Sequence, residues 1–493
     1  METTKRKLVI HMDVNLTCIM QDVANQYTIE ITISKILASQ CWGNIIYKDS
    51  VPSWKLAHPT VSFLQPAPEL TSYDEFIKNL YKNKLPNEEP DETKRQLYNN
   101  EQKTMYLKVI SEFTQPGKPG YKFKSLFDKM IRLLSLPKPI CEEYNLVPED
   151  EKKEEIGVGG DDEDEKELIK RIFASGKMML IPSFFRLIQE LKKNKREFAI
   201  IFRTFGEELD KVIDEFNLFC RGNHPLFNGK HGTPRIRFDG KSKSKDMLID
   251  YNNFGYMARV PSESSFVVGT LKRHPVSESI EEAHSGGIEE GVIVVHQDFP
   301  SIYVAIQERL YKAASMAISD DYRYWNQNGE TGEYGKLLLI DENDYQIQHI
   351  FFDDFIDIDN PRIVDVRDVV TGESIPFKRS INKYIFRVDS YRAIVEQDYF
   401  YKSVLACEEN RSEEIYRIEN GITEEKEEQV DVQVSEWEKL QSSPTDEYLA
   451  RVIMPVLLPA LQVLDIERPQ NPVSFLAHYV LKHQDRVVLP SRS

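Results

Sequence analysis

The chain has 493 residues, of which 41% are hydrophobic, and is therefore long enough to form more than one folded domain with a sizeable core. Lys and Arg together number 63 and Asp and Glu together number 80, so the formal net charge is −17. General nucleic-acid binding is disfavoured, because a chain with this charge repels a phosphate backbone unless a local basic patch opposes the global field.

The N-terminal segment is polar, and its first apolar run ends at Asp13 after a few residues. This run is too short for the apolar region of a signal peptide, and no stretch of the chain has the length needed to span a bilayer. The five cysteines are isolated and form no CxxC pair, so neither a disulfide framework nor a cysteine zinc site is indicated. We therefore expect a cytoplasmic protein with no membrane insertion and no nucleic-acid partner.

Four short apolar runs are typical of parallel strands that are covered on both faces. They span residues 7–12, 197–203, 337–340 and 347–352. His11 and His349 lie within two of these runs, and we expect both to be hydrogen-bonded core residues rather than metal ligands. Helical patterns stand between the runs, at 184–195 and after Pro300. This alternation predicts an α/β fold with a doubly wound parallel sheet.

The segment between the first strand and Ile181 is too long to be a plain crossover. It contains helical patterns at 73–81 and 123–136, which predict an inserted helical cap. Two other stretches, 148–167 and 408–436, are dominated by charge and bury too little apolar surface to fold alone. The expected parts are an α/β core (1–20 and 176–405), the cap (21–147), an acidic linker (148–167), an acidic tether (408–436) and a C-terminal helical hairpin (445–485).

Polar residues with a shared chemistry stand where three of the predicted strands end. Asp13 follows the first strand, Thr204 follows the second, and Asp353-Asp354 follow the last. In α/β folds the carboxyl ends of parallel strands meet at one edge of the sheet, where sites are built. A carboxylate that attacks phosphorus, a hydroxyl that binds phosphoryl oxygens and acidic ligands for Mg²⁺ are the groups that phosphoryl transfer requires.

In this order, the three positions resemble the first, second and fourth motifs of the haloacid dehalogenase (HAD) superfamily. The resemblance implies that Asp13 is the nucleophile, that Thr204 is a phosphate donor, and that Asp353 and Asp354 join Asp13 as ligands of Mg²⁺. The third motif of that superfamily is a lysine that pairs with the nucleophile and the phosphate. Lys336 is the candidate here, and a solvated lysine at the start of a strand is the alternative.

The sequence departs from the HAD pattern at Asn15. Phosphatases of the superfamily have a second aspartate at this catalytic position, which protonates the leaving oxygen and later activates water. An amide does neither. Relatives without this aspartate act on leaving groups that need no proton, or form a phosphoenzyme that turns over slowly. Asn15 therefore argues for weak or absent phosphatase activity.

The C-terminal hairpin carries more apolar surface than a solitary pair of helices buries. Asn471 is a candidate cap for its second helix, with Pro472 at the first helical position, and Pro459 would kink the first helix. The residues expected to line a docking groove are Leu449, Val452, Val456, Leu457, Leu461, Leu464, Phe475, Leu476 and Tyr479.

The segments Glu-Arg-Pro (467–469) and Phe-Leu-Ala-His-Tyr-Val-Leu-Lys (475–482) resemble the dumpy-thirty docking and dimerisation motif. The resemblance implies that two hairpins, from a homodimer or a heterodimer, form an X-type four-helix bundle whose groove binds an amphipathic helix of an anchoring protein. Proteins with this motif include radial-spoke and other ciliary axoneme components. We therefore expect a structural or adaptor protein of the axoneme, and an active magnesium-dependent phosphatase or phosphotransferase with an aspartyl-phosphate intermediate is the alternative.

Overall fold

The computed structural model describes residues 6–21, 27–85, 88–146, 165–230, 232–241, 244–260, 263–271, 294–420, 454–469 and 472–482. The chain divides into two compact units, Met1–Arg411 and Ser412–Ser493, and each is described by itself. In the part of the chain that the structure describes, no helix combines the length and apolar character that crossing a membrane requires.

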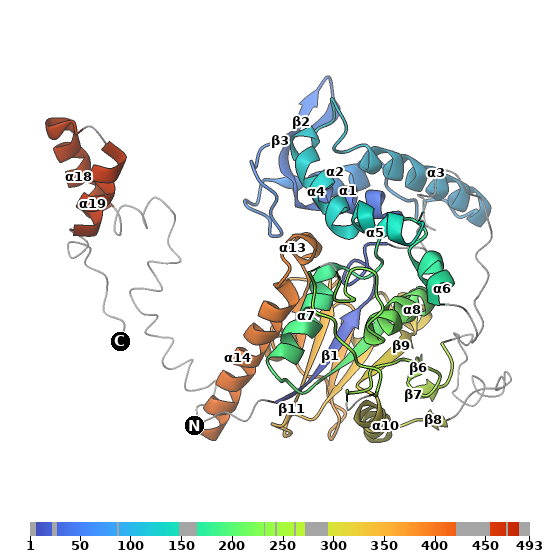
Figure 1. Ribbon diagram of the computed structural model, residues 1–493. Helices are drawn as coiled ribbons and strands as arrows, with labels where there is room; N and C mark the ends of the chain where they lie inside the picture. The colour runs from blue at the N-terminus through green and yellow to red at the C-terminus, as the bar shows by residue number, and fades with distance from the viewer. Residues whose placement is uncertain are drawn as a thin grey trace. The chain divides into compact units, whose positions relative to one another are not determined.

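The first unit is built on an eight-stranded sheet with the strand order β13-β11-β1-β5-β9-β6-β7-β8 (Figure 1). The strands are β1 (Lys7–Asp13), β5 (Phe198–Thr204), β6 (Phe254–Val260), β7 (Glu263–Val268), β8 (Val294–His296), β9 (Ser315–Asp320), β11 (Ile347–Asp353) and β13 (Ile385–Arg387). The strands from β13 to β6 run parallel, whereas β7 pairs antiparallel with both β6 and β8.

The central strands are apolar and buried along nearly their whole length, as parallel strands covered on both faces must be. The strands predicted at 7–12, 197–203 and 347–352 are confirmed as β1, β5 and β11. From β1 the chain passes to β5 and β9 on one side, and later to β11 and β13 on the other. The strand order therefore reverses at β1, and the carboxyl edge beside such a switch point is where open α/β sheets bind ligands.

Helices α7 (Pro182–Lys193), α8 (Leu209–Cys220) and α14 (Tyr399–Glu419) cover one face of the sheet (Figure 1). Phe351 and Ile385 point to the other face, where they pack with residues of β10 (Lys336–Ile340) and β12 (Val364–Asp368). Helix α10 (Phe299–Lys312) also lies on that second face, because its Tyr303 and Gln307 contact His349. His349 is two residues from Phe351 along β11 and so points to the same face of the sheet. The α/β sheet is thus covered on both faces.

Two expectations need correction. The predicted strand at 337–340 forms as β10, but it pairs with β12 in a separate two-stranded sheet, because an apolar run indicates a strand without specifying its partner. The stretch predicted as a tether at 408–436 begins as helix, since α14 continues to Glu419. Arg411 is buried in this part of the helix, and Glu408 forms an ion pair with Arg196.

The inserted cap stands beyond the carboxyl ends of the parallel strands (Figure 1). Its helices are α1 (Ile29–Gln40), α2 (Tyr73–Leu80), α3 (Glu92–Ser111), α4 (Lys124–Leu134) and α5 (Lys138–Glu143). Helix α6 (Glu165–Ile172) follows the cap and contacts α8 of the core. Helices α2 and α4 confirm the patterns seen at 73–81 and 123–136.

The cap is not purely helical, which corrects the expectation from sequence. It contains an antiparallel sheet of β2 (Trp42–Lys48), β3 (Val51–Leu56) and β4 (Thr71–Ser72), with β2 in the middle. Asp49 and Ser50 join β2 to β3 with φ values of 50° and 64°. Two consecutive residues with positive φ are typical of a type I′ hairpin turn, which is most easily recognised when it contains Asn-Gly or Asp-Gly. Asp-Ser is a weaker signal, and the hairpin was missed for that reason.

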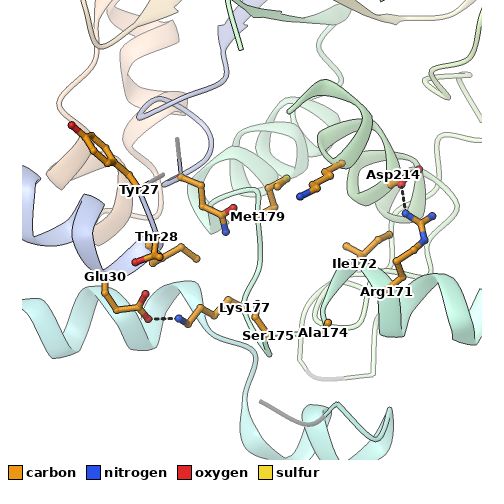
Figure 2. Close-up of a pocket in the computed structure, with 13 residues that line it drawn as sticks. Tyr27, Thr28, Glu30, Arg171, Ile172, Ala174, Ser175, Lys177, Met179 and Asp214 are labelled. Carbon is orange, nitrogen blue, oxygen red and sulfur yellow. Dashed lines mark hydrogen bonds and ion pairs between the residues drawn. The ribbon is translucent and has the colours of Figure 1, made fainter. Parts of the chain in front are cut away.

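The two segments that connect cap and core lie side by side, since Ile19 bridges to Leu180 and the Ile181 amide donates to the Cys18 carbonyl at 2.9 Å. A pocket of about 510 Å³ lies at this junction (Figure 2). Two ion pairs, Glu30 with Lys177 and Arg171 with Asp214, stand in its wall. Residues 147–164, which include most of the predicted acidic linker at 148–167, lie outside the described residues, and 165–167 begin α6.

In the second unit, the described residues of the predicted hairpin at 445–485 form two helices. They are α18 (Met454–Glu467) and α19 (Pro472–Lys482). Helix α18 includes Pro459, so this proline does not end the helix. Helix α19 begins at Pro472, as expected, whereas its predicted cap Asn471 lies outside the described residues.

Candidate functional site

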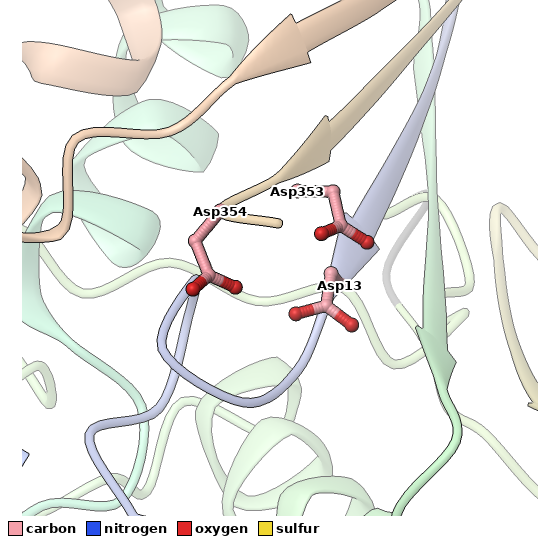
Figure 3. A group of neighbouring side chains, drawn as sticks. All are labelled: Asp13, Asp353 and Asp354. Carbon is pink, nitrogen blue, oxygen red and sulfur yellow. The ribbon is translucent and has the colours of Figure 1, made fainter. Parts of the chain in front are cut away.

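Three carboxylates converge at the switch point of the sheet (Figure 3). Asp13 ends β1, Asp353 ends the neighbouring strand β11, and Asp354 follows directly. One oxygen from each lies within 4.8 Å of the others, while Asp13 is 5% exposed and Asp353 is fully buried. The parallel register of β1 and β11, in which Met12 is opposite Phe352, brings the first two together.

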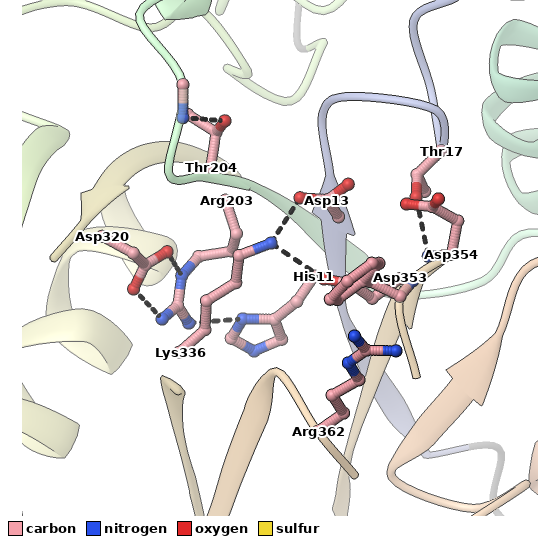
Figure 4. A network of polar contacts seen from close by, with 12 residues as sticks. His11, Asp13, Thr17, Arg203, Thr204, Asp320, Lys336, Asp353, Asp354 and Arg362 are labelled. Carbon is pink, nitrogen blue, oxygen red and sulfur yellow. Dashed lines mark hydrogen bonds and ion pairs between the residues drawn. The ribbon is translucent and has the colours of Figure 1, made fainter. Parts of the chain in front are cut away.

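Lys336 is the cation within this group (Figure 4). Its ammonium donates to Asp13 and, at 2.8 Å, to Asp353, and its side chain is 1% exposed. Burial lowers the pKa of Lys336, but Asp13 and Asp353 raise it further, so the net pKa is above its usual value. Lys336 is therefore buried and protonated rather than solvated, which excludes the alternative left open by the sequence.

The electrostatics of the cluster leave negative charge uncompensated. Burial raises the pKa of Asp13 well above its usual value, with Lys336 opposing this and Asp353 adding to it. Burial, and then Asp353, raise the pKa of Asp354 to about 7. With all three carboxylates ionised, the cluster and Lys336 would carry a net charge of −2 (−3 + 1), and the raised pKa values show that a further cation is needed to favour this state. Carboxylate oxygens in a partly buried cluster with this charge fit Mg²⁺, a hard divalent cation that prefers oxygen ligands.

The loop after β1 holds the cluster in place. Thr17 accepts a hydrogen bond from the Asp354 amide at 3.2 Å through its hydroxyl, which fixes the start of the loop after β11. Leu16, between Asn15 and Thr17, has a φ of 61°, and its carbonyl accepts from Ser390 at 2.6 Å. The turn that follows the candidate nucleophile is thereby tied to two other segments of the core.

Asn15 does not contact the three aspartates through any hydrogen bond in the described structure; its amide nitrogen donates to Glu208 at 3.3 Å. Its amide oxygen is buried and has no hydrogen-bond partner among the described residues. Glu208 is 2% exposed, and a side chain at Gly206 would collide with both Glu208 and Asn15. A carboxylate therefore lies beside Asn15, and it comes from the loop that follows β5.

Thr204 ends β5 and is 1% exposed. It follows Arg203, the residue paired with Asp13 across β1 and β5, so it lies at the same edge of the sheet as the cluster. Its hydroxyl accepts a hydrogen bond from the Gly206 amide at 2.7 Å, which leaves its own O–H able to donate.

A second buried ion pair, between Arg203 and Asp320, lies beside the strand that carries Lys336. The Arg203 guanidinium donates to both oxygens of Asp320, at 2.9 and 2.6 Å, and to the Leu337 carbonyl at 3.0 Å (Figure 4). These bonds join β5 and β9 to β10, the strand that begins with Lys336. The sequence shows one signal of this pair that was missed: Arg203 ends an otherwise apolar run at 198–202.

The two histidines behave as predicted. His11 and His349 are each 3% exposed, and the His11 Nε2 and His349 Nδ1 atoms lie 3.1 Å apart. Burial lowers the pKa of both, so they are neutral and share one hydrogen bond.

In the second unit, α18 and α19 expose apolar side chains. Leu461 is 42% exposed, and Leu457, Leu464, Phe475, Leu476 and Tyr479 are half-buried. A pocket of about 380 Å³ is lined by Leu461, Leu464, Arg468, Pro469 and Pro472. Of the other predicted groove residues, Leu449 and Val452 lie outside the described residues, and the placement of the Val456 side chain is not described.

Comparison with known proteins identifies this hairpin. The family model of the Dpy-30 motif matches residues 444–485, which contain α18 and α19. No HAD-like family model matches the α/β unit, and no solved structure matches the chain. The C-terminal segment is therefore a Dpy-30 motif, which indicates a role in docking and dimerisation through protein–protein contacts.

Proposed function

We propose that the chain is a docking protein of the ciliary axoneme whose α/β unit carries a HAD-like, magnesium-dependent phosphoryl-transfer site with reduced turnover. The observation that carries the second half of this proposal is the burial of Lys336 against Asp13 and Asp353 at the switch point of the sheet. Burying these three charged groups together costs folding free energy, and a ligand that uses them offsets that cost.

In the proposed reaction, an Asp13 carboxylate oxygen attacks phosphorus while the bond from phosphorus to the leaving oxygen breaks. Lys336 opposes the rise in the Asp13 pKa that burial causes and stabilises charge on the phosphoryl oxygens, and Thr204 donates a hydrogen bond to one of them. Mg²⁺, held by Asp13, Asp353 and Asp354, would supply further neutralisation of phosphoryl charge.

Asn15 determines which substrates suit this site. An amide donates no proton to the leaving oxygen and accepts none from water. Leaving groups that are stable as anions, such as carboxylates and nitrophenolates, need no such proton. Hydrolysis of the aspartyl phosphate, in contrast, lacks a base at position 15, so the phosphoenzyme should accumulate.

The experiment that tests this site is hydrolysis of acetyl phosphate and p-nitrophenyl phosphate by the purified chain with Mg²⁺, beside an Asp13→Asn variant. We expect turnover of acetyl phosphate, and a burst of one acetate per active site, both absent from the variant. Equal results for the two proteins on both substrates would refute the phosphoryl-transfer proposal and leave the docking role alone.

The docking half of the proposal rests on the Dpy-30 motif and on its exposed apolar residues. We propose that two copies of the motif, in a homodimer or heterodimer, form the four-helix bundle and that its groove binds an amphipathic helix of an anchoring protein. The ciliary assignment follows from the resemblance of this segment to radial-spoke components.

A matched pair of substitutions tests the docking surface. Leu461→Glu puts a charge on α18, and Leu405→Glu puts one on α14; both leucines are 42% exposed, so neither change creates a cavity. We expect light scattering to show a dimer for the wild type and for Leu405→Glu, and a monomer for Leu461→Glu. A monomeric wild-type chain that also fails to bind amphipathic helices would contradict this half of the proposal.

A further inference from the structure

Arg387 lies beside the carboxylate cluster and has no ion-pair partner among the residues that the structure describes. It ends β13, and its Cα is paired with that of Asp353 across β11 and β13. Among the residues that the structure describes, none forms an ion pair with Arg387, and its buried Nε atom has no hydrogen-bond partner. Its guanidinium instead lies over the ring of Phe63, 4.2 Å from the centroid, and Phe63 belongs to the cap.

Three of the acidic groups near Arg387 already have other partners. Asp357 forms an ion pair with Arg362 at 3.5 Å. Asp389 accepts from Gln40 at 2.7 Å and from two backbone amides at the start of α13 (Ser390–Val395). Asp353 contacts Lys336. Asp354 is a further electrostatic neighbour of Arg387, but among the described residues no ion pair joins the two, so the guanidinium has donors left for an anion that is not part of the chain.

Lys35 offers a second cation from the cap side. It lies on α1, and its charge opposes the rise in the Asp354 pKa that burial causes. Asp354 therefore has Lys35 on the cap and Arg387 on the core as electrostatic neighbours. The Lys35 ammonium itself lies over the ring of Tyr27, 4.8 Å from the centroid.

The order of the strands places Arg387 away from the phosphoryl group. Arg387 is two strands from Asp13 and three from Thr204, which corresponds to roughly 10 and 14 Å at the usual strand spacing. Its stacking on Phe63 directs it toward the cap rather than toward Thr204. The part of a substrate that extends from the phosphoryl group under the cap is its leaving group.

Resting on the proposed phosphoryl-transfer function, we infer that the substrate's leaving group carries a second anionic group, a carboxylate or a phosphoryl, which Arg387 binds from the core and Lys35 approaches from the cap. Arg387 acts here as a residue that determines specificity. A guanidinium suits this task because it presents several donors in a plane to a carboxylate or a phosphate.

Binding of phosphonates, which are not hydrolysed, tests the inference apart from turnover. The probes are phenylphosphonate, 4-carboxyphenylphosphonate, its neutral methyl ester and 1,4-phenylenediphosphonate, each titrated calorimetrically into the full chain with Mg²⁺. We expect the carboxylate or the second phosphonate to increase affinity over phenylphosphonate by about tenfold or more, as a charge-assisted hydrogen bond typically does, and the methyl ester not to do so. The two anionic probes distinguish a carboxylate from a phosphoryl.

Arg387→Gln should reduce this affinity ratio to near one, and Lys35→Gln should reduce it in part. Arg392→Gln is the matched control, because Arg392 pairs with Glu396 on the surface of α13, and it should keep the full ratio. Circular dichroism and melting temperature establish that each variant is folded.

Three outcomes separate the hypotheses. Equal binding of all four phosphonates to the wild type would overturn the second anion site and leave the phosphoryl site standing. A ratio that persists in Arg387→Gln would overturn the assignment to Arg387. Failure of every phosphonate to bind would overturn the proposed function, and this inference with it.

Discussion

Replacing Lys336 with methionine removes the only ammonium that contacts the carboxylate cluster in the described structure while keeping a side chain of similar length. At the 2.8 Å separation from Asp353, an effective dielectric constant of about 20 gives an attraction of roughly 6 kcal/mol. Desolvation of the ions offsets much of this, and loss of one partner from a buried pair typically costs about 3–5 kcal/mol. We therefore expect the Lys336→Met variant to lose about 3–5 kcal/mol of stability in the α/β unit without Mg²⁺.

The assay is denaturant unfolding of the full chain followed by tryptophan fluorescence, since Trp325 lies in the apolar cluster that packs against β10. Lys402→Met is the control: its ammonium pairs with Asp398 on the exposed side of α14, and its loss should not change the midpoint measurably. Mg²⁺ should stabilise Lys336→Met more than the wild type, because the variant's cluster is one charge more negative. An unfolding midpoint for Lys336→Met equal to that of the wild type, with or without Mg²⁺, would refute the reasoning.

Stability should also depend on pH and Mg²⁺ together. The folded-state pKa of Asp354, about 7, is raised above its usual value, so its contribution to stability is complete below about pH 4 and is lost as the pH rises through about 7. Melting curves without Mg²⁺ should show this loss, and Asp354→Asn should make the melting temperature less dependent on pH. Mg²⁺ should raise the melting temperature more at about pH 8 than at about pH 5, because binding requires ionised carboxylates. A stabilisation by Mg²⁺ that is independent of pH would contradict the assignment. Asn15→Asp should place a second carboxyl beside Glu208, where two carboxylates at about 3 Å retain one shared proton and provide the missing acid. Release of phenol in the first turnover of phenyl phosphate, whose leaving group needs a proton, should then become roughly 10- to 100-fold faster, while the acetate burst from acetyl phosphate changes little. Equal effects on the two first turnovers would count against the role given to position 15.

The positions of the strand-end residues could be predicted because they depend on local pattern. Asp13, Thr204 and Asp353 each follow an apolar run, and parallel strands bring their ends to one edge of the sheet. The environment of Lys336 could not be predicted in the same way. Its strand pairs with β12, which the sequence did not reveal, and only this small second sheet brings the ammonium between Asp13 and Asp353.

Glu208 and Arg203 were missed for a different reason. Both are charged residues that become buried only through partners distant in the chain: Asn15, 193 residues away, for Glu208, and Asp320, 117 residues away, for Arg203. A single sequence read by periodicity treats such residues as solvated or as strand ends. The hairpin at 49–50 was not predicted because its turn lacks the glycine that usually marks positive φ.

The retained charges bear on whether the α/β unit serves as more than a support for the Dpy-30 motif. Lys336, the three aspartates and the Arg203–Asp320 pair are all withdrawn from water at least in part. Well-packed apolar residues at such positions are often equally or more stabilising than buried ion pairs, so stability alone does not account for the cluster. Asn15 provides no proton-transfer group for the proposed reaction, whereas the carboxylates, the lysine and Thr204 are all in position. Under the proposed function, the site has the groups that bind a divalent cation and a phosphoryl anion but no group at position 15 that transfers a proton. Such a site favours stable binding of a phosphorylated ligand, or a long-lived phosphoenzyme, over rapid catalysis. The docking motif would then bring a protein that binds phosphoryl groups, rather than a fast phosphatase, to its partner.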